Sequence, residues 1–217
     1  GPETLHTRWM REDHEHDAAG GLRGMKRDGW EGGHRVPFIA RWPGHIPAGQ
    51  VSSQLTNTTD LFATVASVAG YELPAEVAVD SFDMLPAMLG LQDDAETIRP
   101  YMITQSFRGQ FQLRVGPWKY LDHAGSGGNN YSKGWMKEYA LPEGEGEPPA
   151  GQLYHLGRDP GEATNLFATE PEKRDEMRAL LARLTAPEGG RTAPLSRPPR
   201  GMAAASKVAP DASGSGR

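Results

Sequence analysis

A lysine set among glycines is the first residue pattern in this chain that could do chemistry. Lys26 lies in the segment Gly24-Met25-Lys26-Arg27-Asp28-Gly29. A compact ammonium on such a loop can contact the oxygens of a small anion, and the glycines at both ends let the backbone come close to it. The ordinary alternative is a solvated loop lysine beside two other cations, Arg23 and Arg27. Lys26 is therefore a candidate anion-binding residue.

A dense run of charge precedes this segment. Residues 11–17 read Arg-Glu-Asp-His-Glu-His-Asp, and a His-x-His pair beside carboxylates can bind zinc or calcium. Charge runs of this kind are more often solvated surface, so we assign no metal ligand in this chain. We expect contacts to a substrate from this segment instead.

Composition excludes several classes of protein. The 217 residues contain no cysteine, which excludes a disulfide framework and thiolate zinc sites. The net charge of −5 argues against nucleic acid as a partner, because phosphate neutralisation needs clustered Lys and Arg. No apolar run approaches the ~20 residues of a membrane-spanning helix. Phosphate loops, serine nucleophile elbows and zinc-binding His-Glu-x-x-His helices are absent as motifs.

The elements before residue 99 are predicted from apolar patterns and turn signals. Residues 1–35 are polar and rich in glycine and are predicted to form a long loop. The apolar run 36–42, closed by Pro43-Gly44, predicts a buried strand. Thr59 and Asp60 suit the start of a helix that ends at Gly70, and a short helical turn is expected over 84–89.

The second half of the chain is predicted to form a small sheet followed by a helix. Strands are predicted at 100–107, 110–115 and 118–122, forming an antiparallel meander, with another strand at 152–156. Thr169 and Glu172 fit a capping box for a helix over 170–184, whose apolar residues recur at helical spacing. Residues 187–217 have too little apolar surface to fold and are predicted to be a disordered tail.

Three stretches share their order and spacing with one known family. They are Gly24–Gly44 with Glu31-Gly32-Gly33 at its centre, Asp60–Pro86, and Trp118–Leu166 with the turn Asp159-Pro160-Gly161-Glu162. Together these stretches resemble the sulfatases of the alkaline-phosphatase-like superfamily, over roughly residues 1–185. Ser81 departs from the pattern, which usually has glycine there, and we interpret it as a tolerated turn variant.

The resemblance implies an α/β fold class: the C-terminal portion of the sulfatase fold, with a small antiparallel-sheet subdomain and a terminal helix. Residues 1–98 would be the C-terminal part of the large domain. Residues 99–186 would be the small subdomain with its helix at 170–184, and residues 187–217 the tail.

The resemblance also implies an activity, that of a sulfuric ester hydrolase such as an arylsulfatase. Lys26 matches the family's lysine and would be catalytic. His34 and Arg35, which come after the Gly-Gly turn, would bind substrate; alternatively they are structural, with Arg35 paired to Glu31. Family members use a calcium ion and a formylglycine made from Cys or Ser in a Cys/Ser-x-Pro-x-Arg motif. Both sites would lie upstream of this chain, which is therefore predicted to be inactive alone.

Two other features bear on that interpretation. Gly1-Pro2-Glu3-Thr4 resembles the residues directly after a metal-binding Asp-Asn pair in sulfatases, although Gly1-Pro2 could also be a cloning remnant. Ser196-Arg197-Pro198-Pro199-Arg200 has the form Ser-x-Pro-x-Arg. It lies in the predicted tail without a strand or helix pattern around it, so we interpret it as a chance match.

The expected partner is a sulfate-ester substrate, either a sulfated glycan or an aryl sulfate, with neither nucleic acid nor membrane. The family suggests a periplasmic or extracellular location, and the polar start of the chain is no signal peptide. Two alternatives stay open. One is a phosphodiesterase or phosphonate hydrolase of the same superfamily, and the other is a non-catalytic glycan-binding module.

Overall fold

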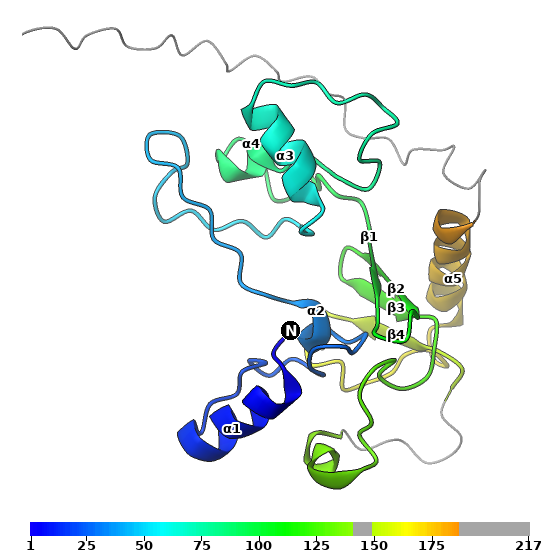
Figure 1. The fold of residues 1–217 in the computed structure, drawn as a ribbon. Coiled ribbons are helices and arrows are strands. Elements are labelled where there is room, and N and C mark those ends of the chain that lie inside the picture. Colours follow the sequence, from blue (N-terminus) through cyan, green and yellow to red (C-terminus); the bar gives the residue numbers. More distant parts are fainter. Residues whose placement is uncertain (141–148, 187–217) are drawn as a thin grey trace, which may run out of the picture. The chain divides into compact units, whose positions relative to one another are not determined.

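The computed structural model describes residues 1–140 and 149–186 (Figure 1). Backbone contacts divide them into two compact units. The first, here called the sheet unit, contains Gly1–Ala40 and the described residues from Pro100 onward; the second contains Arg41–Arg99. The tail predicted at 187–217, including Ser196, lies outside the described residues. The boundaries predicted at residues 98 and 186 stay predictions.

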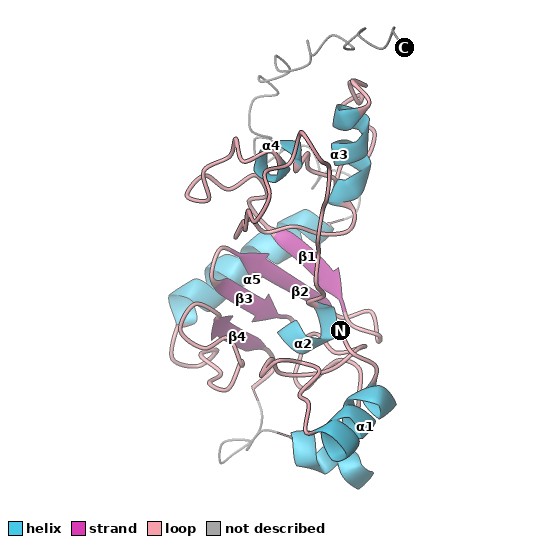
Figure 2. Ribbon diagram, turned by 90° about the vertical axis from the view of Figure 1, so that its left-hand side faces the viewer, coloured by secondary structure: helices cyan, strands magenta, loops and turns pink. Residues whose placement is uncertain are grey.

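The sheet unit is built on four antiparallel strands in sequential order (Figure 2). They are β1 (Met102–Gln105), β2 (Phe111–Val115), β3 (Trp118–Leu121) and β4 (Gln152–His155). The predicted meander is confirmed, and β4 pairs with β3 to extend it. Because side chains alternate along a strand, cross-strand partners form rows that face one side or the other.

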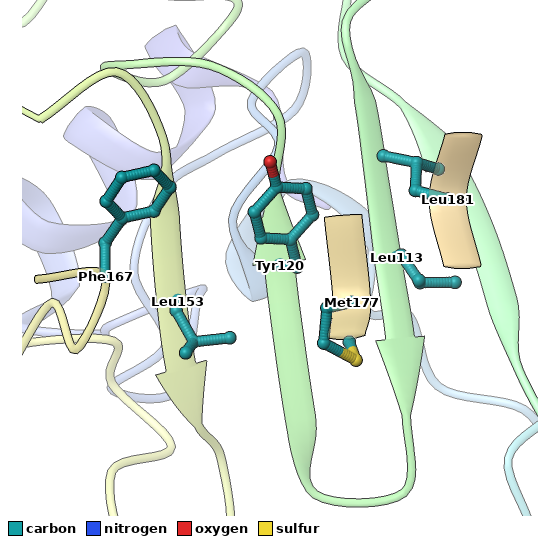
Figure 3. Packing of buried hydrophobic residues seen from close by; sticks show 6 residues of the cluster. All are labelled: Leu113, Tyr120, Leu153, Phe167, Met177 and Leu181. Carbon is teal, nitrogen blue, oxygen red and sulfur yellow. The ribbon is translucent and has the colours of Figure 1, made fainter. Parts of the chain in front are cut away.

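One face of the sheet packs against helix α5 (Pro171–Thr185). Leu113, Tyr120 and Leu153 are partners across β2, β3 and β4 and therefore lie in one row. Met177 and Leu181 of the helix pack on that row (Figure 3). The helix predicted over 170–184 and its apolar face are confirmed. Burying these side chains contributes roughly 1.5–3 kcal/mol each.

The predicted capping box of α5 is wrong. The residue at the cap position is Glu170, and it makes no side-chain cap hydrogen bond. The Thr169 hydroxyl instead donates to the carbonyl of Leu166, 3.3 Å away. Pro171 occupies the first turn, where its missing N–H removes one donor that would otherwise need a cap.

The loop predicted over residues 1–35 is also wrong in part, because it contains α1 (Thr4–His14) and the single turn α2 (Glu31–His34). The Glu3 carboxylate accepts the backbone N–H of Thr4 at 3.0 Å, which starts α1. Arg8 and Glu12, one turn apart, pair at 2.7 Å. Thr7 is the one buried residue of α1, so this helix has no apolar stripe for a sequence pattern to reveal.

The buried strand predicted over residues 36–42 is a further error. These residues form no strand, and Val36, Phe38 and Ile39 are 59%, 51% and 90% exposed. A strand is stabilised by hydrogen-bonded neighbours, and none of the described strands pairs with this segment. The apolar composition of the segment is strand-like, but the described residues supply no partner.

The second unit contains α3 (Asp60–Val68) and α4 (Leu85–Met88) around a small core. Both predicted helices are confirmed, and α3 ends as expected before Gly70, which has a positive φ of 69°. The buried Asp60 carboxylate pairs with the Arg99 guanidinium and accepts the N–H of Phe82 at 2.9 Å. No described helix is long and apolar enough to cross a membrane.

Ser81 has a structural explanation in this unit. Its hydroxyl donates to the carbonyl of Thr59 at 2.7 Å and accepts the N–H of Ala63 at 2.9 Å. The side chain therefore satisfies a backbone donor in the first turn of α3, where Thr59 itself makes no side-chain cap. This accounts for a serine at a position where the family pattern usually has glycine.

Candidate active site

The second face of the sheet carries the anchor of the lysine loop, here defined as residues 22–30. Arg114, Lys119 and Tyr154 are cross-strand partners and form a row on the face opposite α5. Lys119 is 2% exposed. A buried ammonium is tolerated only when it is paired with an anion. The anion is Glu31, which begins α2 immediately after the loop.

Four residues form the buried charge cluster, in which Glu31, Lys119 and Glu162 are buried and Arg114 is half-buried. The Lys119 Nζ lies 2.9 Å from the Glu31 Oε1 and 3.1 Å from the Glu162 Oε1. The Arg114 Nη1 donates to the Glu31 Oε2 at 3.2 Å, and the Glu162 Oε2 accepts the backbone N–H of Glu31 at 2.6 Å. One ammonium thus joins the sheet, α2 and the turn at residues 159–162.

The two carboxyl groups of the cluster differ in pKa. Burial alone would raise the pKa of Glu31, but Lys119, followed by Arg114, outweighs burial and holds that pKa below its usual value. Burial raises the pKa of Glu162 in spite of Lys119. Glu31 is therefore the firm anion of the cluster, and it fixes the start of α2.

The Glu-Gly-Gly turn closes the lysine loop onto its own beginning. The N–H of Gly32 donates to the carbonyl of Arg23 at 2.7 Å. A Cβ at Gly32 would lie 2.2 Å from the carbonyl oxygen of Gly24, and one at Gly33 would lie 2.2 Å from that of Asp28. Only glycine permits this approach, which explains why two glycines come after Glu31.

Asp28 holds the middle of the loop. Its carboxylate is fully buried and accepts the backbone N–H of Met25 at 2.9 Å and that of Asn129 at 2.8 Å. The Tyr131 hydroxyl donates to the same carboxylate. Burial and the neighbouring Asp28 raise the pKa of Tyr131, so its hydroxyl stays a donor. The backbone on both sides of Lys26 is thereby fixed.

Lys26 itself points to the surface from this fixed backbone. Its side chain is 58% exposed, and its Nζ lies 3.4 Å from the Glu3 Oε2. The Lys26 backbone N–H donates to the carbonyl of Pro2 at 2.9 Å. Arg27 binds both Glu3 oxygens, at 2.6 and 3.1 Å, and chiefly through this hydrogen bond lowers the pKa of Glu3 to about 2. Lys26 thus presents an accessible ammonium on a loop whose backbone is held by hydrogen bonds.

His34 and Arg35 differ in their surroundings. The Nε2 of His34 is buried and has no hydrogen-bond partner among the described residues. Burial, with a smaller effect of Lys119, lowers the pKa of His34 to about 4, so its ring is neutral near pH 7. Arg35 is exposed, and its N–H donates to the carbonyl of Glu31 at 2.8 Å. The Glu31 carboxylate is instead bound by Lys119 and Arg114.

A metal site does not assemble from the described residues. No three His, Cys, Asp or Glu side chains among them come together as a ligand set. The described residues therefore do not supply a ligand set for the calcium ion that the sulfatase resemblance implies.

Sequence reasoning missed three residues of this site: Asp28, Lys119 and Glu162. Lys119 interrupts an otherwise apolar strand, Trp118–Leu121, and that interruption is a signal for a buried ion pair. Glu162 closes the Asp-Pro-Gly-Glu turn and has a left-handed φ of 52°, which few sequence patterns predict.

Comparisons with known proteins identify relatives of this chain by sequence. The family model described as Sulfatase matches residues 10–71, which include the lysine loop and the Glu-Gly-Gly turn. N-acetylgalactosamine-6-sulfatase of Sus scrofa is 37% identical over 159 residues, covering 71% of this chain and 30% of that protein. Human arylsulfatase A is 35% identical over 193 residues, covering 85% of this chain and 35% of that protein.

A solved structure gives the same result at the level of the fold. A Bacteroides thetaiotaomicron protein, described in connection with the metabolism of multiple glycosaminoglycans, superimposes with a TM-score of 0.64 at 28% identity. The match covers 81% of this chain and 34% of that one. The chain thus spans about a third of the length of the proteins it matches. Its helices and four-stranded antiparallel sheet are part of the alkaline-phosphatase-like sulfatase fold, and the chain belongs to the sulfatase family.

Proposed function

We propose that these residues belong to an enzyme that hydrolyses sulfate esters, with Lys26 as a catalytic residue. The observation that carries the proposal is the exposed Lys26 ammonium on a loop whose backbone is fixed on both sides. A group that must meet a small anion needs this combination of access and rigidity. The family match to the same residues supports it.

The chemistry of sulfate-ester cleavage explains what an ammonium would contribute. Negative charge collects on the leaving oxygen as its bond to sulfur breaks, and a fixed positive charge beside that oxygen lowers the barrier. Lys26 can also donate a proton to the departing alkoxide, which would act as general-acid catalysis. Before it does either, the sulfate oxygens must compete with Glu3 for the same Nζ.

His34 and Arg35 are proposed to bind the substrate. The ring of His34 is neutral near pH 7, so His34 would orient the substrate without adding charge. Arg35 is exposed and would offer its guanidinium to an anionic group. Both residues are joined to Lys26 through α2 and the lysine loop.

The cofactors of the family complete the proposal. In sulfatases generally, a formylglycine supplies the nucleophile and a calcium ion holds the sulfate oxygens. The described residues form no group of three metal ligands, and the chain contains no cysteine. Both would have to come from other parts of the enzyme.

A sulfated glycan is the proposed substrate class, because the names of several relatives specify a sulfated N-acetylgalactosamine. A periplasmic or extracellular location remains part of the proposal.

The test is made in an enzyme that contains this chain together with a formylglycine. Lys26→Ala should lower kcat for an aryl sulfate about 10²–10³-fold, the typical loss of one oxyanion-stabilising group. Lys133→Ala, which removes another exposed ammonium, is the matched control and should leave kcat unchanged. Equal kcat in Lys26→Ala would remove Lys26 from the mechanism. Faster turnover of a phosphate diester than of the sulfate ester would show that the enzyme is a phosphodiesterase rather than a sulfatase.

A further inference from the structure

A cavity of about 570 Å³ lies in the sheet unit beside the lysine loop. One wall is formed by α1 and the residues that come after it, including Arg11, His16 and Asp17. A second wall is the loop backbone at Gly24 and Met25, and Tyr139 from the 3-10 helix η1 (Gly134–Tyr139) lies on a further side. This α1 cavity has the volume of an ordinary small-molecule site.

The polar groups in the α1 cavity are available to a ligand. The Arg11 guanidinium lies 5.0 Å from the centre of the Tyr139 ring, and it makes no hydrogen bond or ion pair with any described residue. The Asp17 carboxylate accepts the N–H groups of Ala19 and Gly21, at 3.0 and 2.5 Å, which fixes its position and leaves further lone pairs open. The cavity thus offers an unpaired donor cation and a fixed acceptor.

This combination suits a sugar ring with an anionic substituent. Sugar hydroxyls donate hydrogen bonds to a carboxylate such as that of Asp17, and a guanidinium binds carboxylate or sulfate groups through two parallel hydrogen bonds. The Tyr139 side chain has an apolar ring and a polar hydroxyl, which match the apolar face and the hydroxyl groups of a sugar. A purely apolar ligand would desolvate the Arg11 guanidinium without giving it a hydrogen-bond partner.

The position of the cavity links it to the proposed reaction. Gly24 and Met25 line it, and Lys26 is the next residue along the chain. Consecutive Cα atoms are about 3.8 Å apart, less than the length of one sugar unit. The wall that Met25 forms therefore begins within the length of one sugar unit of the Lys26 backbone.

We propose that the α1 cavity is a subsite for the sugar unit next to the sulfated one in an anionic oligosaccharide. Arg11 binds the carboxylate or sulfate of that unit, and Asp17 accepts one of its hydroxyls. The assignment rests on the proposed function, which places the sulfate ester at Lys26. Because Arg11 and Asp17 both belong to the charged segment 11–17, this assignment makes that segment a determinant of substrate specificity.

The experiment measures binding to the whole 217-residue chain by chemical-shift titration. One probe is a disaccharide of a hexuronic acid and N-acetylgalactosamine 6-sulfate, and the other is N-acetylgalactosamine 6-sulfate alone. Arg11→Gln should weaken binding of the disaccharide about ten-fold, since one charge-assisted hydrogen bond is lost, and leave the monosaccharide unaffected. Arg183→Gln, the same change at an exposed position on α5, is the control.

The outcomes separate this subsite from the proposed function. Equal disaccharide affinity in Arg11→Gln, or no binding by the unmodified chain, overturns the subsite. Lys26→Ala should weaken both probes. If it weakens neither while Arg11→Gln still weakens the disaccharide, the subsite holds and the role of Lys26 fails. Because Arg11 is exposed, its replacement should leave the amide spectrum of the free chain otherwise unchanged, which excludes misfolding as the cause.

Discussion

At Lys119 an ammonium that is 2% exposed faces two carboxylates, one from α2 and one from the turn at Glu162. Removing one partner of a buried ion pair costs more than the pair contributes, because the remaining charge stays buried without compensation. The residue therefore has a measurable effect on stability although it contacts no proposed substrate.

Lys119→Met should destabilise the sheet unit by about 3–5 kcal/mol, because Glu31 and Glu162 lose their shared cation. Urea denaturation followed by tryptophan fluorescence measures this, since Trp30 belongs to the same unit. The control is Lys173→Ala, which removes an exposed ion pair with Glu176 and should cost less than about 1 kcal/mol. Similar values for both variants would mean that the buried charge cluster is not a stabilising anchor.

His34 should make the free energy of unfolding depend on pH. Its folded pKa of about 4 lies below the ordinary 6.5, so the unfolded chain binds a proton first as pH falls. Stability is therefore full above pH 6.5 and declines between about 6.5 and 4, by at most about 3 kcal/mol. His34→Gln should flatten this part of the profile, and ring-proton NMR should give the midpoint directly. A midpoint near 6.5 would contradict the buried, neutral ring.

At the scale of elements, the sequence predicted those whose stability comes from a pattern of apolar residues. Strands β2 to β4 and α5 bury apolar side chains and are present in the structure, as is the predicted β1. Helix α3 is present too, but its apolar residues Leu61, Phe62 and Val65 are 42%, 57% and 62% exposed. Helix α1 was missed because it buries Thr7 alone and is held by Glu3 and by the Arg8–Glu12 pair. A strand was wrongly predicted for residues 36–42 because an apolar run indicates strand propensity but does not show which strand would pair with it.

The candidate site was predictable only in part for a similar reason. Lys26 is a candidate because a motif marks it, whereas Asp28 and Lys119 act through contacts with residues about 90–100 positions away in the chain. Alternation along β3 places Lys119 on the face opposite Tyr120, but the contacts that Lys119 makes there depend on how the strands pair. A sequence shows the alternation, but the register decides which loop meets that face.

The unpaired segment at residues 36–41 should exchange its backbone hydrogens rapidly. Among the described residues no backbone or side-chain acceptor binds the amides of Val36, Phe38 or Ile39, and their side chains are largely exposed. Hydrogen exchange of the isolated chain should show near-intrinsic rates there and slow exchange in β3, which pairs on both sides. Protection of Phe38 and Ile39 comparable to that of β3 would show that the segment has found a partner strand.

At the scale of the whole molecule, the chain spans about 30% of the length of its curated relatives and has no cysteine. The isolated chain should therefore show no turnover of an aryl sulfate, because it offers no established formylglycine precursor. Ser196→Ala is the control, since Ser196 gives the one formal match to Ser-x-Pro-x-Arg. Activity that disappears in Ser196→Ala would reverse our interpretation of that match.

The buried charge cluster also restricts how this sequence can change over time. Glu31, Lys119 and Glu162 come from three separate parts of the chain, and replacing Lys119 alone leaves two carboxylates buried without their shared cation. Replacing the cluster by apolar residues therefore requires two or three substitutions together, because the variants that carry only one of them are less stable. Substitutions at the three positions should therefore occur together among related sequences, whereas neighbouring surface residues should change independently.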